Sequence, residues 1–183
     1  MRIVAGKRKG MTIKTIESDS TRPTRDVVRE ALFSILMNKI PDAVFLDLFA
    51  GSGAIGIEAI SRGAEVAYFS DVNPQCIKVI NENIAKAKFE EQSKVFKADY
   101  KLVLNKLREN KFNIIYIDPP YNKGFGIDAI EIISNNDMLF EDGVIILETD
   151  TNEEVPEEIG KYIKYNEKKY GRNILNLFKT KGE

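Results

Sequence analysis

Two short segments of the sequence carry residue types suited to binding a nucleoside and positioning an amine. The first, residues 46–56, places Asp47 ahead of a G-x-G-x-x-G match that begins at Gly51. Between a predicted strand and a predicted helix, such glycines let the backbone approach a ligand closely. Asp71 ends the next predicted strand, 20 residues after Gly51, where a carboxylate can bind ribose hydroxyls. The combination predicts a cofactor that contains a nucleoside.

Asp47 favours one class of such cofactors. A dinucleotide enzyme binds pyrophosphate at the helix N-terminus, and a carboxylate just before the glycines would repel it. The sulfonium and ammonium groups of S-adenosylmethionine are instead attracted by a carboxylate. The order of acid and glycines therefore favours a methyl donor over NAD, with a simple turn-capping role for Asp47 as the alternative. The candidate cofactor residues of this loop are Asp47, Phe49, Ala50, Gly51, Ser52 and Gly53.

The second segment follows an apolar run, residues 114–117, with Asp118, Pro119, Pro120 and Tyr121. Two consecutive prolines fix φ and donate no hydrogen bonds, so the carbonyl groups here can face a ligand. We predict that the Asp118 carboxylate and the Pro119 carbonyl each accept one N–H of a planar exocyclic amine, while Tyr121 stacks on its ring. The plainer alternative is a Pro-Pro turn that ends a buried strand. Because the segment follows the glycine loop in the chain, we interpret these four residues as catalytic.

Residue types that are missing exclude several mechanisms. The chain of 183 residues has no histidine and one cysteine, Cys76. Without histidine there is no Ser-His-Asp triad and no histidine-bound metal, and one thiol excludes an internal disulfide or a thiolate zinc cluster. We expect no metal. Cys76 lies on a predicted helix and is interpreted as a packing thiol, not as the nucleophile that methylation of a pyrimidine carbon would need.

Basic residues gather near the N-terminus. The totals are balanced, with 27 Lys+Arg and 28 Asp+Glu, but residues 1–39 hold nine basic and four acidic side chains, a net of +5. A basic segment on an acidic remainder fits a polyanionic partner, with an ordinary solvated surface as the alternative. Three of the arginines share one side of a predicted helix, and three further cations form the tip of a predicted hairpin. The candidate residues for contact with such a polyanion are Lys7, Arg8, Lys9, Arg22, Arg25 and Arg29.

A regular order of elements must position these segments. Residues 2–5 and 11–16 predict a β-hairpin, and a helix is expected from Thr24. From Val44 onward, short apolar runs alternate with amphipathic stretches, which is typical of a mostly parallel sheet with helices on both faces. The strands are expected at 44–49, 66–69, 95–97, 112–117 and 144–147, with an antiparallel pair at 162–165 and 174–178, and helices are expected to start near Gly53, Pro74, Tyr100 and Ile127. The predicted fold class is therefore α/β.

Several segments resemble the RsmD family of bacterial 16S rRNA guanine-N2 methyltransferases. They are residues 2–6 with Gly10, 22–33, 46–59, 118–121 and 170–171, so the likeness spans nearly the whole chain. The segment 22–24 is the most specific to the family, since glycine loops and Asp-Pro-Pro-Tyr occur in many amino-methyltransferases. The chain departs from the family at Arg25, where threonine is usual, and at Asp71, where glutamate is common.

This resemblance implies a fold, a cofactor and a substrate. The fold is the Rossmann-like class I S-adenosylmethionine-dependent methyltransferase fold, with a seven-stranded sheet and an N-terminal hairpin. Asp71 would hold the cofactor ribose, and Asp99 and Tyr100 would lie beside its adenine. The reaction would methylate the N2 amine of a guanine in 16S rRNA, in the small ribosomal subunit or an assembly intermediate. We expect one methyltransferase domain over residues 1–183, in which residues 1–40 extend the catalytic core at 41–183 for RNA contact.

The remaining expectations concern the protein's setting and the alternatives. No apolar run approaches the roughly 18 residues of a membrane span, and the first residues lack the apolar segment of a secretory signal, so a cytoplasmic monomer is expected. A structured particle should be a better substrate than naked RNA, because the total charge is balanced. The alternatives are methylation of adenine N6 in DNA or of a protein glutamine, and a non-catalytic RNA-binding assembly factor. Residues 122–126 are either a lid or a plain loop.

Overall fold

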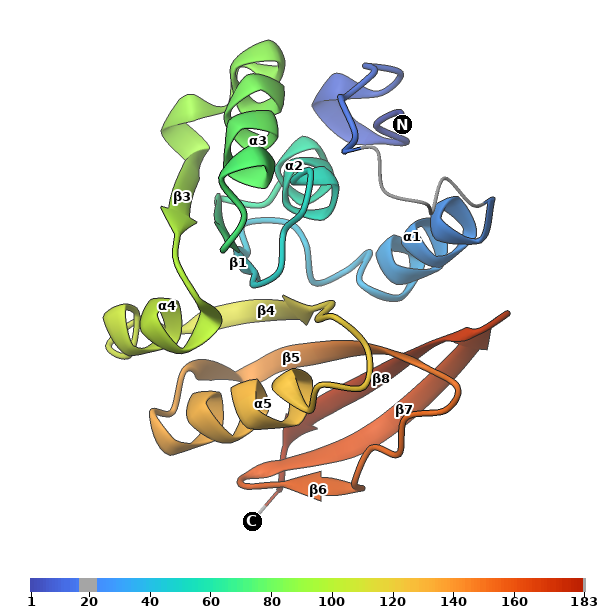
Figure 1. Ribbon diagram of the computed structural model, residues 1–183, viewed down its shortest axis with the longest axis vertical. Coiled ribbons are helices and arrows are strands. Elements are labelled where there is room, and N and C mark those ends of the chain that lie inside the picture. The colour runs from blue at the N-terminus through green and yellow to red at the C-terminus, as the bar shows by residue number, and fades with distance from the viewer. Residues whose placement is uncertain (17–22, 183) are drawn as a thin grey trace.

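The computed structural model describes residues 1–16 and 23–182, with the backbone alone at 23–25. In these residues one sheet of eight strands runs in the order β3-β2-β1-β4-β5-β8-β7-β6 (Figure 1). Strands β1 to β5 pair in parallel, and β6 to β8 continue the sheet in antiparallel pairing. The predicted α/β fold with a mostly parallel sheet and an antiparallel edge is confirmed.

The sheet has one strand more than the seven that the family resemblance implies. The parallel strands are β1 (Val44–Asp47), β2 (Val66–Asp71), β3 (Ser93–Lys97), β4 (Phe112–Ile117) and β5 (Leu139–Asp150). The antiparallel strands are β6 (Glu158–Ile159), β7 (Tyr162–Tyr170) and β8 (Asn173–Thr180). The additional strand is β6, whose two residues fold back on β7. A strand this short leaves no alternating pattern in the sequence, and sequence analysis therefore misses it.

The helices cover both faces of the sheet, because adjacent strand residues point to opposite sides. Phe45 belongs to the hydrophobic cluster that includes residues of α1, α2 and α3, whereas Leu46 belongs to the cluster that includes residues of α4 and α5. In the described residues, no helix is both long and apolar enough to cross a membrane. The helices are α1 (Pro23–Ile35), α2 (Ala54–Ser61), α3 (Pro74–Ala87), α4 (Tyr100–Lys106) and α5 (Phe125–Asn135), with short 3-10 helices at Gly6–Arg8 and Glu90–Gln92.

The N-terminal arm, residues 1–16, is less regular than the predicted hairpin. Its two halves do run antiparallel, but the pairing is an isolated bridge between Arg2 and Thr12 in place of two strands. The 3-10 helix Gly6–Arg8 lies where the hairpin tip was expected. The reason is that side chains of neighbouring helices take up donors of the arm. The Lys14 N–H, for example, donates to Asn83 Oδ1 of α3 at 2.8 Å.

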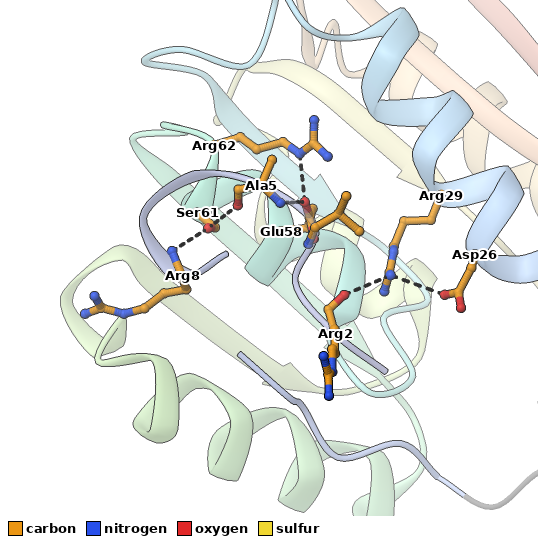
Figure 2. Close-up of polar contacts among 9 residues, drawn as sticks. Arg2, Ala5, Arg8, Asp26, Arg29, Glu58, Ser61 and Arg62 are labelled. Atoms are coloured by element: carbon orange, nitrogen blue, oxygen red, sulfur yellow. Dashed lines mark hydrogen bonds and ion pairs between the residues drawn. The ribbon is translucent and has the colours of Figure 1, made fainter. Parts of the chain in front are cut away.

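Glu58 of α2 is the main anchor of the arm (Figure 2). Its side chain is fully buried, and its two carboxylate oxygens accept hydrogen bonds from the backbone N–H groups of Val4 at 2.8 Å and Ala5 at 3.0 Å. Arg62 Nε, one helical turn further on, donates to the same carboxylate at 2.8 Å. A buried carboxylate is stable only with such partners. The arm and α2 therefore depend on each other.

Ser61 adds a second link between α2 and the arm (Figure 2). Its hydroxyl donates to the Ala5 carbonyl at 2.7 Å and accepts from the Arg8 N–H at 2.9 Å. The arm passes so close that a Cβ on Gly6 would lie 1.8 Å from the Ser61 carbonyl oxygen. Gly6 also has φ +80°, which favours glycine. The arm is thus held along its length against the helix that follows the glycine loop.

Replacing Glu58 by glutamine is expected to lower the free energy of unfolding by about 2–4 kcal/mol, because three donors lose a buried charged acceptor. Urea unfolding followed by circular dichroism measures the loss. Glu82→Gln is the matched control, since Glu82 pairs with Lys14 at the surface and such pairs contribute little. Equal losses in the two variants would contradict the role of Glu58 as the anchor of the arm.

Candidate active site

Two cavities adjoin at the C-terminal ends of the parallel strands, which is where open α/β sheets bind ligands. The larger cavity, of about 340 Å³, is lined by Leu48, Phe49, Asp71, Val72, Ala98, Asp99, Tyr100, residues 118–121 and Phe125. The smaller cavity, of about 130 Å³, is lined by Met1, Val28, Arg29, Asp47, residues 49–52, Ala54, Ile55, Tyr116, Asp118 and Glu148. Phe49 and Asp118 line both cavities. The two cavities are therefore neighbouring parts of one site.

Asp71 holds the glycine loop, residues 48–53, in place. Asp71 Oδ2 accepts a hydrogen bond from the Gly51 N–H at 3.0 Å, and Oδ1 accepts one from the Asn73 N–H at 2.8 Å. Gly51 has φ +55°, and a Cβ built on it would meet no atom of another residue within 4 Å. The spacing of Gly51 and Asp71 in the sequence thus corresponds to a direct contact. The loop leaves open space where a ligand could approach its backbone.

Two further residues of the loop are fixed through their backbone groups. The Ala50 N–H donates to the carbonyl of Ser70 in β2 at 2.8 Å. The Ser52 carbonyl accepts from Asn83 Nδ2 of α3 at 2.9 Å. Because the same Asn83 side chain also holds Lys14, one residue of α3 connects the loop to the N-terminal arm.

Asp47 ends β1 and lies buried against the first turns of α2. Its Oδ2 accepts a hydrogen bond from the Gly56 N–H at 3.1 Å. Burial raises the pKa of Asp47 to about 7, with the Gly56 hydrogen bond opposing this rise and the charge of Asp71 adding to it. The carboxyl group therefore titrates near neutral pH. Asp47 both caps the turn and lines the smaller cavity, so the two roles weighed for it are compatible.

Aromatic rings form one wall of the larger cavity. The centroid of the Tyr100 ring lies 5.4 Å from that of Phe49 and 5.5 Å from that of Phe125. The Tyr100 hydroxyl donates to Asp128 Oδ2 at 2.6 Å, and burial together with this bond raises the pKa of Tyr100. Asp99 caps α4 by accepting from the Lys101 N–H at 2.9 Å. Asp99 and Tyr100 thus lie beside the Asp71 end of this cavity, each held by a hydrogen bond.

The segment 118–121 follows β4 and borders the larger cavity. Tyr121 is 39% exposed, and its hydroxyl accepts a hydrogen bond from Asn173 Nδ2 at 3.0 Å. The same amide donates to Glu148, which also accepts a hydrogen bond from the Tyr116 hydroxyl. Burial raises the pKa of Tyr116 well above its usual value, and the charges of Glu148 and Asp118 add to this effect. Tyr116 is therefore a neutral donor that holds Glu148.

Tyr116, Asp128, Glu148 and Asn173 are not among the candidate residues predicted from the sequence. Glu148 follows the predicted apolar run 144–147, so the rule that identified Asp47 and Asp71, a carboxylate at the end of a strand, could have found it. Nothing comparable marks Asn173. It reaches Tyr121 only because β8 pairs with β5, in a register that places Asn173 opposite Asp150.

Of the candidate RNA-binding residues, Lys7 and Lys9 are exposed. Arg8 is half-buried: its Nε donates to the Ala87 carbonyl at 2.5 Å, and its guanidinium lies 5.3 Å from the centroid of the Phe89 ring. Arg29 is only 5% exposed, which does not fit the predicted contact with RNA phosphate. Its side chain faces the N-terminal arm and the smaller cavity instead. Arg22 lies outside the described residues, and only the backbone of Arg25 is described, within α1.

Residues 122–126, for which the sequence left a lid and a plain loop as alternatives, are partly helical. Phe125 and Gly126 form the start of α5. Phe125 packs on Tyr100, and a Cβ on Gly126 would lie 2.4 Å from a methyl group of Leu147. These two of the five residues are packed into the fold, which does not fit a lid. For metals, no group of three or more His, Cys, Asp or Glu in residues 1–16 and 23–182 is placed to hold an ion.

Comparison with known proteins extends the likeness over the whole chain. The family model described as conserved hypothetical protein 95 matches residues 1–179. The chain is 34% identical to YlbH of Bacillus subtilis strain 168 over 184 residues, which cover 100% of both proteins. It is 30% identical to ribosomal RNA small subunit methyltransferase D of Escherichia coli strain K12 over 183 residues, which cover 100% of this chain and 91% of that protein.

Solved structures agree with this relationship. The structure of yhhF from Escherichia coli has a TM-score of 0.86 at 30% identity, with 100% of this chain and 99% of that chain covered. Protein TTHA0928 from Thermus thermophilus has a TM-score of 0.82 at 26% identity, with 98% and 99% covered. With a family model matched over residues 1–179 and a named relative that aligns with the full length of this chain, the chain belongs to the RsmD family of rRNA methyltransferases.

Proposed function

We propose that this chain transfers a methyl group from S-adenosylmethionine to the exocyclic N2 amine of a guanine in 16S rRNA of the small ribosomal subunit. The observation that carries the proposal is the position of Asp118. It follows the end of β4 and lines both cavities, so its carboxylate lies where the two cavities meet, next to a cofactor that would span them, and can face an amine that approaches this junction. The name of the Escherichia coli relative supports rRNA of the small subunit as the substrate.

The residues of the two cavities fit S-adenosylmethionine. The larger cavity offers the carboxylates of Asp71 and Asp99 as acceptors for ribose hydroxyls and the adenine amine, beside the rings of Phe49 and Tyr100. The smaller cavity offers Asp47 to a cationic group. These residues would hold the adenosine part in the larger cavity and the methionine part in the smaller one. When bound, the cofactor supplies an electrophilic methyl group carried on a sulfonium.

Asp118 and Pro119 orient the guanine amine. The Asp118 carboxylate and the Pro119 carbonyl each accept one N–H of the amine, which leaves the nitrogen lone pair directed at the methyl group. The contribution of these two acceptors is positioning, since a correctly oriented pair of reactants needs no covalent enzyme intermediate. Their site beside the junction of the cavities suits this role.

Tyr121 provides the stacking surface for the base. Its partly exposed ring can cover an unstacked guanine. The hydrogen bond from Asn173 restrains the Tyr121 hydroxyl, and Asn173 is in turn held by the buried Glu148. The ring is therefore placed before the base arrives, which reduces the entropy lost on binding.

The exposed cations of the arm would contact the RNA backbone. Arg2, Lys7 and Lys9 are exposed, and such contacts add affinity but little base specificity. With a balanced total charge, recognition relies on the shape of the target more than on bulk attraction. A protein-bearing subunit or assembly intermediate is therefore the proposed substrate, modified by a monomer in the cytoplasm.

The direct test is transfer of labelled methyl from S-adenosylmethionine to small ribosomal subunits that lack the modification, with naked rRNA, DNA and protein in parallel. We expect N2-methylguanosine in the subunit and a lower rate on naked RNA. The Asp118→Ala variant should lose about 100-fold or more in rate, as is typical when a group that acts in the transition state is removed. It should still bind S-adenosylhomocysteine within a few-fold of the unmodified protein. Label in DNA or protein would contradict the proposal that 16S rRNA is the substrate.

The affinity for S-adenosylmethionine should depend on pH through Asp47. The pKa of Asp47 is about 7 in the free protein, so its negative charge is lost as the pH falls below 7 and its attraction for the cationic cofactor is lost with it. Affinity measured by calorimetry should rise with pH by up to roughly tenfold per unit between about pH 5.5 and 7 and then level off. In Asp47→Asn the affinity should be lower and this rise absent. A rise of equal size in the variant would rule out Asp47 as its source.

Removing Lys7 and Lys9 together should weaken RNA binding without affecting the cofactor. In Lys7→Ala/Lys9→Ala, the slope of log affinity against log salt should become shallower by about 2, because each phosphate contact contributes about 0.9. Filter binding to the subunit between about 50 and 200 mM salt measures the slope. Lys111→Ala/Lys161→Ala is the control, since both lysines are exposed in part and pair with Asp137, away from the arm. An unchanged slope in the arm variant would show that RNA lies elsewhere.

A further inference from the structure

Arg29 is a buried cation whose hydrogen-bonding capacity is only partly used. Its Nη2 donates to the Arg2 carbonyl of the arm at 2.9 Å and lies 3.2 Å from Asp26 Oδ1 (Figure 2). Among the residues that the structure describes, its Nε and Nη1 have no hydrogen-bond partner. The Arg29 side chain is only 5% exposed, whereas that of Asp26 is 62% exposed. Within the described residues, the ion pair of Arg29 is therefore with an exposed partner.

An incompletely paired guanidinium is costly in the interior of a protein. It stays protonated at all ordinary pH values, so it cannot escape the cost by losing a proton. Each buried donor without an acceptor carries a desolvation penalty. A fold that keeps such a group beside a cavity is suited to an anionic ligand that supplies the missing acceptors.

The surroundings of Arg29 select the kind of anion. The smaller cavity that Arg29 lines is also lined by three carboxylic residues, Asp47, Asp118 and Glu148. A phosphate group, with up to two charges, would be repelled by them at close range. A zwitterionic amino acid is matched instead, because its carboxylate can face the guanidinium while its ammonium faces a carboxylate. Two parallel N–H donors of arginine are well suited to a carboxylate.

We infer that Arg29 binds the α-carboxylate of the methionine part of S-adenosylmethionine. The inference rests on the proposed function, which places that part in the smaller cavity. It gives α1 a specific role, since this helix carries the cation to the cavity beside the glycine loop and the Arg2 carbonyl of the arm orients it. Arg29 is then a cofactor-binding residue that sets the position of the sulfonium end relative to Asp118, and it does not touch RNA.

The test compares two ligands that differ by the carboxylate alone. S-adenosylhomocysteine carries it, and 5′-deoxy-5′-(3-aminopropylthio)adenosine keeps the ammonium but lacks it. Calorimetry should show that Arg29→Met binds S-adenosylhomocysteine at least about tenfold more weakly than the unmodified protein does, as expected for lost hydrogen bonds to a charged group. Its affinity for the amine analogue should change by less than about threefold. Arg29→Lys, which keeps the charge without the fork, should fall between the two proteins.

Ser134→Ala, at a buried serine that lines neither cavity, is the control for a general loss of stability. It removes the hydrogen bond from the Lys161 N–H at 2.9 Å without touching the arm or either cavity, and it should leave the ratio of the two affinities unchanged. Thermal unfolding of each variant verifies that it is folded, and Arg29→Lys remains available if Arg29→Met does not fold.

Three outcomes would overturn the inference. Equal losses for both ligands would show that Arg29 only shapes the site. Unchanged cofactor binding with weakened binding of the ribosomal subunit would show that its partner is a phosphate of RNA. Failure of the unmodified protein to bind S-adenosylhomocysteine would overturn the proposed function together with the inference, whereas the first two outcomes leave the proposed function standing.

Discussion

The need of buried carboxylates for hydrogen-bond donors organises both the site and the arm. Asp71 accepts a hydrogen bond from the Gly51 N–H and so shapes the glycine loop. Asp47 accepts one from the Gly56 N–H and so fixes the start of α2. Glu58, on the same helix, accepts hydrogen bonds from two backbone N–H groups of the arm. Asp47 and Glu58 are buried and need these donors, and the half-buried Asp71 accepts its donors in the same way. The backbone is consequently fixed at each of these three acids.

These hydrogen bonds explain why the arm and α1 belong to the site, although both precede the Rossmann-like part of the chain. Glu58 holds the arm, the arm offers the Arg2 carbonyl to Arg29, and Arg29 closes the smaller cavity from α1. The basic N-terminal segment was expected to contact RNA with all of its candidate cations. In the structure these cations lie in two different environments. Lys7 and Lys9 are exposed, whereas Arg29 faces the space proposed for the cofactor.

The amine end of the site relies on a different kind of support. Asp118 to Tyr121 lie at the end of a parallel strand, but Asn173, which donates a hydrogen bond to Tyr121, lies on the antiparallel strand β8. Glu148 on β5 and Asn173 on β8 lie on paired strands and share a hydrogen bond. The antiparallel strand β8 therefore extends the sheet and also connects the buried Glu148 to the substrate side through Asn173.

The amino-acid sequence by itself determined the α/β class, the glycine loop with Asp71, and the segment 118–121. Each of these is a local signal, carried by hydrophobic periodicity or by residues in fixed order after a strand. Tertiary structure alone decided that Arg29 turns inward, that Glu58 anchors the arm, and that Asn173 reaches Tyr121. These contacts join residues 27 to 54 positions apart, and no local pattern encodes which side chains meet once the strands and helices pack.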